Sequence, residues 1–155
     1  MKIETIIEVS SWLIMGMALF LLVPKEKIRD AHIIFLFHQV ITWICGFAVI
    51  EMKWLEYPVR FFAYASRTSF TFEYFVCPAL AVIFALYYPK THALIKRISY
   101  SIIFISIITI TEVAIERYTD LIDYHQWKWY WTWISVLTAF YLTRRYYYWF
   151  FKIGR

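Results

Sequence analysis

The sequence predicts an all-α membrane protein, a bundle of five transmembrane helices in a single domain of residues 1–155. Two observations support this prediction. Apolar residues make up 62% of the 155 residues and charged residues only 17%, whereas soluble domains contain roughly 45–50% and about 25%. In addition, the chain contains five long runs with few charges, and a membrane-spanning helix needs about 20 mostly apolar residues. A soluble fold of this length would have too few polar residues to cover its surface.

The five runs follow one another along the chain with short connectors between them. The first contains only Glu8, the second contains no charged residue, and the third and fourth contain one acid each, Glu73 and Glu112. The fifth carries Trp and Tyr at both ends, and these side chains favour the head-group level of a bilayer. Unbroken apolar runs favour helices, because strands of a membrane barrel would alternate apolar and polar residues. The helices are predicted near residues 6–23, 31–50, 70–88, 98–115 and 129–147.

The basic residues predict how the chain is oriented. Short cytoplasmic connectors are enriched in Lys and Arg, and with five spans ten of the sixteen basic residues lie on the side of the C-terminus. Nine of the eleven acids lie on the opposite side. We therefore expect the N-terminus outside, the C-terminus in the cytoplasm, and a multipass protein of the cell membrane. The net charge of +5 indicates attraction to anionic lipid head groups, with no nucleic-acid partner.

Ionisable and polar residues inside the predicted spans are the candidates for function, because they are costly there and usually face the bundle interior. They recur at helical spacing on three of the helices. These stripes are His38, Thr42 and Cys45; Ser69, Glu73 and Cys77; and Ser106, Thr109, Glu112 and Glu116. Together with nearby arginines they predict a polar intramembrane cluster, either an ion site or a packing site. Its members are Glu73, Glu112, Glu116, Arg67, Arg117 and His38.

Two interpretations of the carboxylates remain open. Glu73 and Glu112 each lie about one helical turn, or roughly 5 Å, inside the outer boundary. In the first interpretation they form interfacial ion pairs with Arg60, Arg67, Arg117 or Lys53, and these pairs fix helix packing. In the second, Glu73, Glu112 and Glu116 converge on a cation or a proton, and like charges in a partly dry site raise one carboxylate pKa.

His38 lies about 18 Å from the outer edge, too deep to touch those carboxylates. It is either hydrogen-bonded within the bundle, with Gln39 as its neighbour, or joined to the carboxylates by a proton path through Thr42 and Cys45. Pro78 lies within the third run and removes one backbone hydrogen bond, which is tolerated in membrane helices. We expect it to bend that helix mildly.

The sequence predicts neither catalysis nor a cofactor. GxxxxGK[ST], GxGxxG, HExxH and GxSxG motifs are absent from it, and so is a pair of CxxC motifs. His125 with Asp120, Asp123 and Glu116 matches no recognised ligand spacing, so no metal is predicted. The leading hypothesis is a structural or accessory membrane component that works in the lipid bilayer through a partner membrane protein or a second copy. The alternative is a small cation- or proton-coupled transporter or channel that uses the intramembrane carboxylates.

Three stretches carry a resemblance to a known family. They are EYPVRFFAYASRTSFTFEYFVCP (56–78), EVAIERYTDLIDYHQWKWYWTW (112–133) and FYLTRRYYYWFF (140–151). They resemble an uncharacterised family of small multipass membrane proteins from spore-forming Gram-positive bacteria, whose members have about this length. The resemblance implies a multipass helical fold in the cytoplasmic membrane. It implies no activity, and it supplies no catalytic or binding residues.

Overall fold

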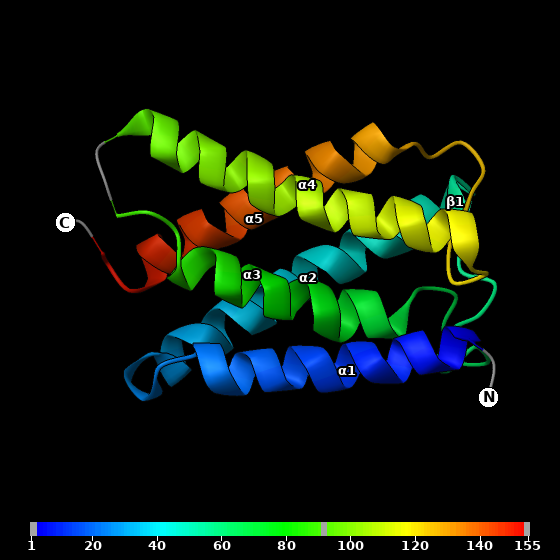
Figure 1. Ribbon diagram of the computed structural model, residues 1–155, viewed down its shortest axis with the longest axis horizontal. Helices are drawn as coiled ribbons and strands as arrows, with labels where there is room; N and C mark the ends of the chain where they lie inside the picture. The colour runs from blue at the N-terminus through cyan, green and yellow to red at the C-terminus, as the bar shows by residue number, and fades with distance from the viewer. Residues whose placement is uncertain (1–2, 91–92, 154–155) are drawn as a thin grey trace.

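The computed structural model describes residues 3–90 and 93–153, and the protein is 74% helical. The prediction of a helical fold is confirmed, and five α-helices occur among the described residues. They lie along the long axis, with the N-terminus at one end of the bundle and the C-terminus at the other (Figure 1). The helices are α1 (Ile3–Leu22), α2 (Ile28–Glu51), α3 (Cys77–Leu86), α4 (Leu94–Tyr118) and α5 (Trp129–Phe150).

A short connector reverses the chain between α1 and α2. Pro24 is extended, with φ −61° and ψ 145°, and it precedes the single 3-10 turn η1 (Lys25–Lys27). Proline has no N–H to continue the preceding helix, so α1 ends before it. Asp30 lies in the first turn of α2, where a carboxylate is favoured by the helix dipole, and Lys27 Nζ lies 2.7 Å from its Oδ2.

The third rod begins as the π-helix η2 (Phe70–Val76) and continues as α3. Ser69 caps it, because its Oγ accepts a hydrogen bond of 3.2 Å from the backbone N of Phe72. The rod ends at Leu86, two residues before the predicted end, whereas α5 continues to Phe150, three residues beyond it. Figure 1 shows α3 between α1 and α4, and α3 also packs closely on α2.

Of the five predicted membrane spans, three correspond to helices that could cross a membrane. Three helical segments are long and apolar enough to cross a membrane: Ile3–Leu22, Lys25–Glu51 and Leu94–Tyr118. The rod Phe70–Leu86 is apolar but shorter. α5 is not among the three, because its Trp, Tyr and Thr residues and Arg144 and Arg145 make it less apolar. The three long apolar helices indicate that the protein associates with a membrane.

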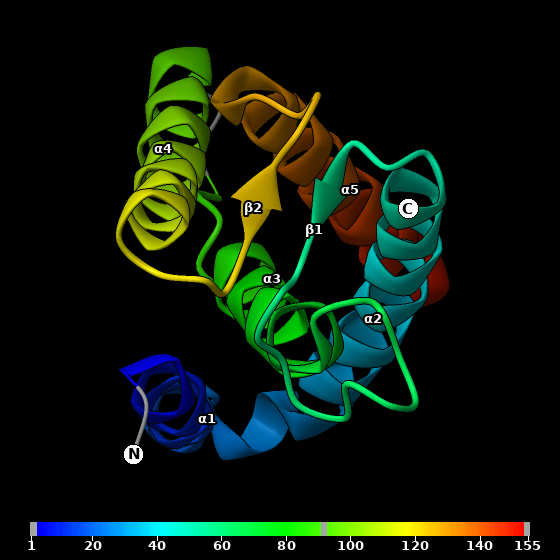
Figure 2. The ribbon, with the colours of Figure 1, turned by 90° about the vertical axis from the view of Figure 1, so that its right-hand side faces the viewer.

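The two long connectors at the N-terminal end of the bundle are paired, which the sequence analysis did not predict. The strand β1 (Leu55–Glu56) lies antiparallel to β2 (Asp123–Tyr124), with Leu55 opposite Tyr124 and Glu56 opposite Asp123. The carbonyl of Trp54 accepts the backbone N–H groups of residues 125, 126 and 127. Figure 2 shows this ladder lying across the end of the bundle. Buried Leu55, Tyr57 and Ile122 form a small core beneath it.

The main core fills the other half of the bundle and is rich in aromatic side chains. Phe84 of α3 is completely buried and its ring contacts those of Tyr100, Phe104 and Phe140. The Arg144 guanidinium lies 3.8 Å from the centroid of the Tyr88 ring. Contacting rings therefore fill the interior of this half of the bundle. One cavity of about 380 Å³ lies at its C-terminal end, and another lies in the half near β1 and β2.

Candidate functional site

Glu73 lies on η2, in the half of the bundle near β1 and β2, and it is only 4% exposed. Its carboxylate rests on Gly46 of α2, where a Cβ would lie 2.2 Å from Oε1 and 2.3 Å from Oε2. A side chain at position 46 would therefore force the Glu73 carboxylate to move. Oε2 is buried and has no hydrogen-bond partner among the described residues. A buried polar atom without a partner costs stability, so this atom is a binding-site candidate.

Pro78 interrupts the backbone hydrogen bonds of the third rod below Glu73. Side chains of α2 donate instead to the carbonyls that are left free. The π-type bond from the backbone N of Cys77 to the carbonyl of Phe72 precedes Pro78, which has no N–H for the next carbonyls. Gln39 Nε2 donates to the carbonyl of Tyr74 at 2.7 Å. Thr42 Oγ1 donates to the carbonyl of Glu73, also at 2.7 Å. The polar stripe of α2 thus packs against the polar stripe of the third rod.

Glu112 of α4 is hydrogen-bonded to groups from β2 and α5. Its Oε1 accepts from the Tyr124 hydroxyl and, at 2.7 Å, from Thr132 Oγ1. Thr132 in turn accepts from the Trp127 indole N at 2.8 Å. Burial, then the charge of Glu112 and its hydrogen bond, raise the pKa of Tyr124 above its usual value. Tyr124 therefore stays protonated and remains a donor to the carboxylate.

Tyr57, in the connector after β1, lies near both Glu73 and Glu112. It is 8% exposed. Burial raises the pKa of its hydroxyl well above the usual value of 10, and the negative charges of Glu73 and Glu112 raise it further. Tyr57 is therefore a protonated hydroxyl close to both carboxylates. No sequence pattern indicated this role, since Tyr57 lies in a connector outside every polar stripe.

A third acid, Glu8 of α1, lies on the same side of the bundle and was missing from the predicted cluster. It is 4% exposed. Its Oε1 accepts from Thr71 Oγ1 at 3.1 Å and from the backbone N of Phe61 at 3.2 Å. Trp12 adds a hydrogen bond to Thr71 at 3.3 Å. Its depth, close to that of Glu73 and Glu112, is the sequence feature that could have pointed to it.

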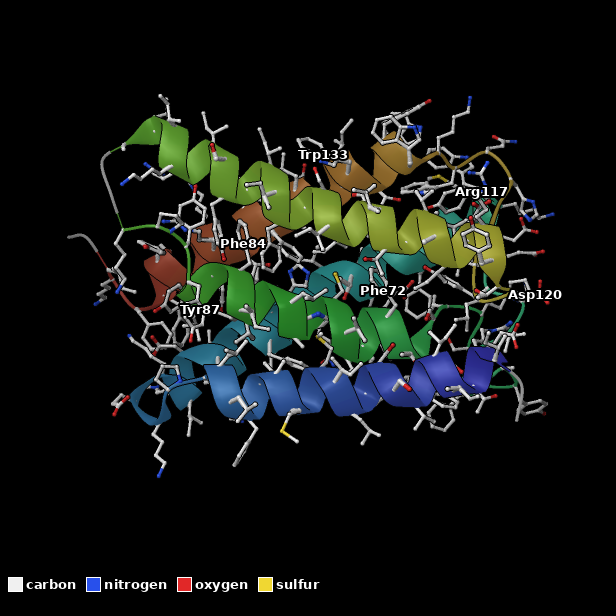
Figure 3. All side chains as sticks on the ribbon, viewed as in Figure 1. Phe72, Phe84, Tyr87, Arg117, Asp120 and Trp133 are labelled. Carbon is white, nitrogen blue, oxygen red and sulfur yellow. The ribbon has the colours of Figure 1, made fainter. Side chains whose placement is uncertain are left out.

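The predicted ion pairs between these acids and arginines are wrong. Within residues 3–90 and 93–153 the ion pairs are Lys27 with Asp30 and His125 with Glu56. Arg67 and Arg117 are exposed, and Figure 3 shows Arg117 at the end of the bundle. Arg60 instead donates to the backbone carbonyls of its own connector, at residues 57, 63 and 66. Arg60 is therefore held by its own connector, and among the described residues neither Glu73 nor Glu112 forms an ion pair.

The remaining predicted members lie apart from this group. Glu116 is partly exposed one turn beyond Glu112. His38 is completely buried in the other half of the bundle. Its Nδ1 lies 2.7 Å from Thr143 Oγ1 and its Nε2 lies 3.4 Å from Cys77 Sγ. His38 is thus hydrogen-bonded within the bundle, through Thr143 and Cys77; the expected neighbour, Gln39, points to the third rod.

A cavity of about 370 Å³ lies between α1, the third rod and α4. Figure 3 shows Phe72, one of its lining residues, on the rod between α1 and α4. Glu8, Glu112 and Tyr57 line it together with Ser69, Thr71 and a majority of apolar side chains. A cavity of this size, mostly apolar with a few convergent polar groups, is typical of a small-molecule site. Glu8 and Glu112 therefore face a space that could hold a ligand, and Glu73 is not among the residues that line it.

Three exposed side chains on the ladder bring possible metal ligands together. The ligand atoms of Glu56, Asp123 and His125 all lie within 4.8 Å of one another. In the sequence, His125 was considered together with Asp120, Asp123 and Glu116. In the structure, the ladder sets Glu56 opposite Asp123, so Glu56 takes the place of Asp120 and Glu116 in the group around His125.

Comparisons with protein-family models, with curated proteins and with solved structures find no match to this chain.

Proposed function

We propose that this protein is a non-enzymatic, accessory component of the cell membrane that crosses the bilayer five times. The rod Phe70–Leu86 is about 26 Å long and α5 about 33 Å at 1.5 Å per residue, which approaches or exceeds the roughly 30 Å hydrocarbon core. Both lie along the same axis as the three long apolar helices (Figure 1). The rod is also packed on α2, so it must share the depth of that helix.

The positions of the basic residues support an N-terminus outside and a C-terminus in the cytoplasm. Lys25, Lys90 and Lys152 lie at the end of the bundle that holds the C-terminus, whereas the acidic ladder lies at the other end. Two of the sixteen basic residues, Lys2 and Arg155, lie outside the described residues. The excess of basic residues beside the C-terminus supports a cytoplasmic location for that end.

The accessory role rests on the packed interior in the half of the bundle away from β1 and β2. His38 is 0% exposed, and Phe84 and Phe140 are 0% and 1% exposed. The cavity beside Glu112 reaches inward as far as Leu80. A second cavity of about 380 Å³ lies at the C-terminal end of the bundle, beside Tyr87 and Tyr147. Buried rings lie between the two cavities, so the arrangement favours a component that holds something in one leaflet over one that passes it through.

The family resemblance is part of this proposal. The stretches 56–78 and 112–133 meet in the structure through the pairing of β1 with β2. They supply Tyr57, Ser69, Thr71 and Glu112, which line the cavity, and the buried acid Glu73. Similarity concentrated in these stretches supports membership of that family of small multipass proteins in the cytoplasmic membrane.

Coupled transport of a cation or proton is the second candidate, because Glu73 is buried with an unpartnered Oε2 and with no ion pair among the described residues. An uncompensated acid inside a membrane helix is a recognised mark of ion and proton sites.

Flux and crosslinking measurements separate the two candidates. The purified protein is reconstituted in liposomes and proton and monovalent cation flux are compared for wild type, Glu73→Gln and Glu112→Gln, with Glu51→Gln at the exposed end of α2 as the matched control. The accessory role predicts no flux above empty liposomes and one stoichiometric crosslinked partner in cells, either another membrane protein or a second copy. Flux in the wild type and Glu51→Gln that disappears in folded Glu73→Gln would establish transport and contradict the accessory role.

A further inference from the structure

The cavity between α1 and α4 has polar and apolar ends. Glu8, Ser69 and Glu112 lie on its side nearest β1 and β2, and the apolar lining extends inward to Met15 on α1. Seven residues separate Glu8 from Met15, which corresponds to about 10 Å along the helix. α1 and α4 are both long enough to cross a membrane, so this apolar part of the cavity is placed at the depth of lipid chains.

Each of the two acids in this cavity is held by one oxygen only. Oε1 of Glu8 receives the bonds from Thr71 and Phe61, and Oε1 of Glu112 receives those from Tyr124 and Thr132. Within residues 3–90 and 93–153, neither Oε2 accepts a hydrogen bond, and neither atom is fully buried. The protein therefore orients both carboxylates and leaves the second oxygen of each accessible.

The charge around this cavity selects for a cation. The side chains that line it include two acids and no Lys, Arg or His. A carboxylate inside a membrane protein is stabilised by a positive partner, and a primary ammonium offers three hydrogen-bond donors. The hydroxyls of Ser69 and Thr71 also line the cavity and can accept from such a group. An anionic head group would be repelled by both acids, and a hydroxyl head group offers one donor where an ammonium offers three.

The volume limits the shape of the occupant. About 370 Å³ lies at the lower end of the range for small-molecule sites, about 300–1,000 Å³. Even one turn of an α-helix with its side chains, about 10–12 Å in diameter and 5.4 Å long, occupies more than this volume. One alkyl chain fits between the apolar walls, where each buried CH₂ contributes about 0.8 kcal/mol in transfer from water.

We propose that the cavity between α1 and α4 binds a single-chain amphiphile with a primary ammonium head. The ammonium donates to Oε2 of Glu8 and of Glu112. The alkyl chain runs inward between α1 and α4, along Ile14 and Met15 on one side and Ile107 and Ile108 on the other.

Photolabelling in nanodiscs tests this assignment. The full-length protein in phosphatidylcholine nanodiscs is irradiated with a dodecylamine that carries a diazirine near the end of its chain, and labelled peptides are mapped by mass spectrometry. We expect labels within residues 7–15 and 107–115. Unmodified dodecylamine should compete at a concentration at least tenfold below that of dodecanol or dodecanoate.

Variants extend the test. Glu8→Gln with Glu112→Gln keeps the side-chain shapes and should weaken competition by dodecylamine at least tenfold, whereas Glu51→Gln should leave it unchanged. Ile107 is 60% exposed, so Ile107→Trp should fold while blocking the chain site and removing the label. Equal competition by dodecanol or dodecanoate would overturn the proposal, as would an unchanged response of the Glu8 and Glu112 double variant. Crosslinks between the cavities of two copies would assign the space to a second chain and would also overturn it.

Discussion

Replacing Gly46 by Ala tests whether the Glu73 carboxylate rests on the backbone of α2. The added methyl would lie 2.2 Å from Oε1, 2.3 Å from Oε2 and 2.4 Å from Cδ of Glu73. These distances are more than about 1 Å below ordinary van der Waals contact. Glu73 is 4% exposed, so its carboxylate must move within a packed interior to make room.

The expected magnitude follows from overpacking and helix propensity. Inserting a methyl group into a packed site costs about 1–3 kcal/mol, so Gly46→Ala should lower the free energy of unfolding by that amount. In a Glu73→Ala background the obstructing atoms are gone. Alanine is then favoured over glycine within a helix by about 0.5–1 kcal/mol, so the same substitution should become stabilising.

The assay is a double-mutant cycle on the purified protein in micelles, with unfolding followed by titration with a denaturing detergent. We expect a coupling free energy of about 1.5–4 kcal/mol between positions 46 and 73, the sum of the cost in wild type and the gain in the Glu73→Ala background. Gly16→Ala in α1 is the matched control, because no atom lies within 4 Å of its added Cβ. It should be neutral or stabilising in both backgrounds. Equal costs for Gly46→Ala with and without Glu73 would refute the contact.

Three further substitutions follow from the hydrogen bonds and the pKa. Gln39→Leu leaves the carbonyl of Tyr74 without its donor and should lower the free energy of unfolding by about 1–3 kcal/mol. In a Pro78→Ala background a backbone N–H returns, so the cost should be smaller. An equal cost in both backgrounds would show that Pro78 does not create the need for this bond. Thr143→Val removes the partner of His38 Nδ1 and should cost about 1–3 kcal/mol, measured by the same unfolding titration; no change would show that the bond carries no stability. Tyr57 has a raised folded-state pKa, so its contribution to stability is complete below about pH 10 and is lost as pH rises toward the folded value. The thermal midpoint of Tyr57→Phe should therefore fall less than that of wild type between pH 9 and 11, and parallel curves would contradict the burial of this hydroxyl.

The helices were predictable because their signal is local. The long apolar runs gave the positions of α1, α2 and α4, and the stripes with Thr42 and Glu73 identified faces that do meet. Helical periodicity alone carries that information.

The rest depends on contacts that no local pattern encodes. His38 meets Thr143 across 105 residues of sequence, and the pairing of β1 with β2 joins two connectors that have no strand-like alternation. The ion pairs were expected because arginines lie near the acids in sequence. Instead, Thr71 donates to Glu8, and Tyr124 and Thr132 donate to Glu112. A hydroxyl can satisfy a carboxylate without the desolvation cost of a buried second charge.

We propose that five helices cross the membrane with the ladder end outside. Four single cysteines test it directly: Tyr64→Cys and Asp120→Cys at the ladder end, and Glu26→Cys and Lys152→Cys at the other end, all at exposed positions. Native Cys45 and Cys77 lie within helices, so the unsubstituted chain is the background control. A membrane-impermeant maleimide applied to intact cells should label positions 64 and 120 only, and positions 26 and 152 only after the membrane is opened. Labelling of position 26 or 152 in intact cells, or protection of position 64 or 120, would contradict the five-span arrangement.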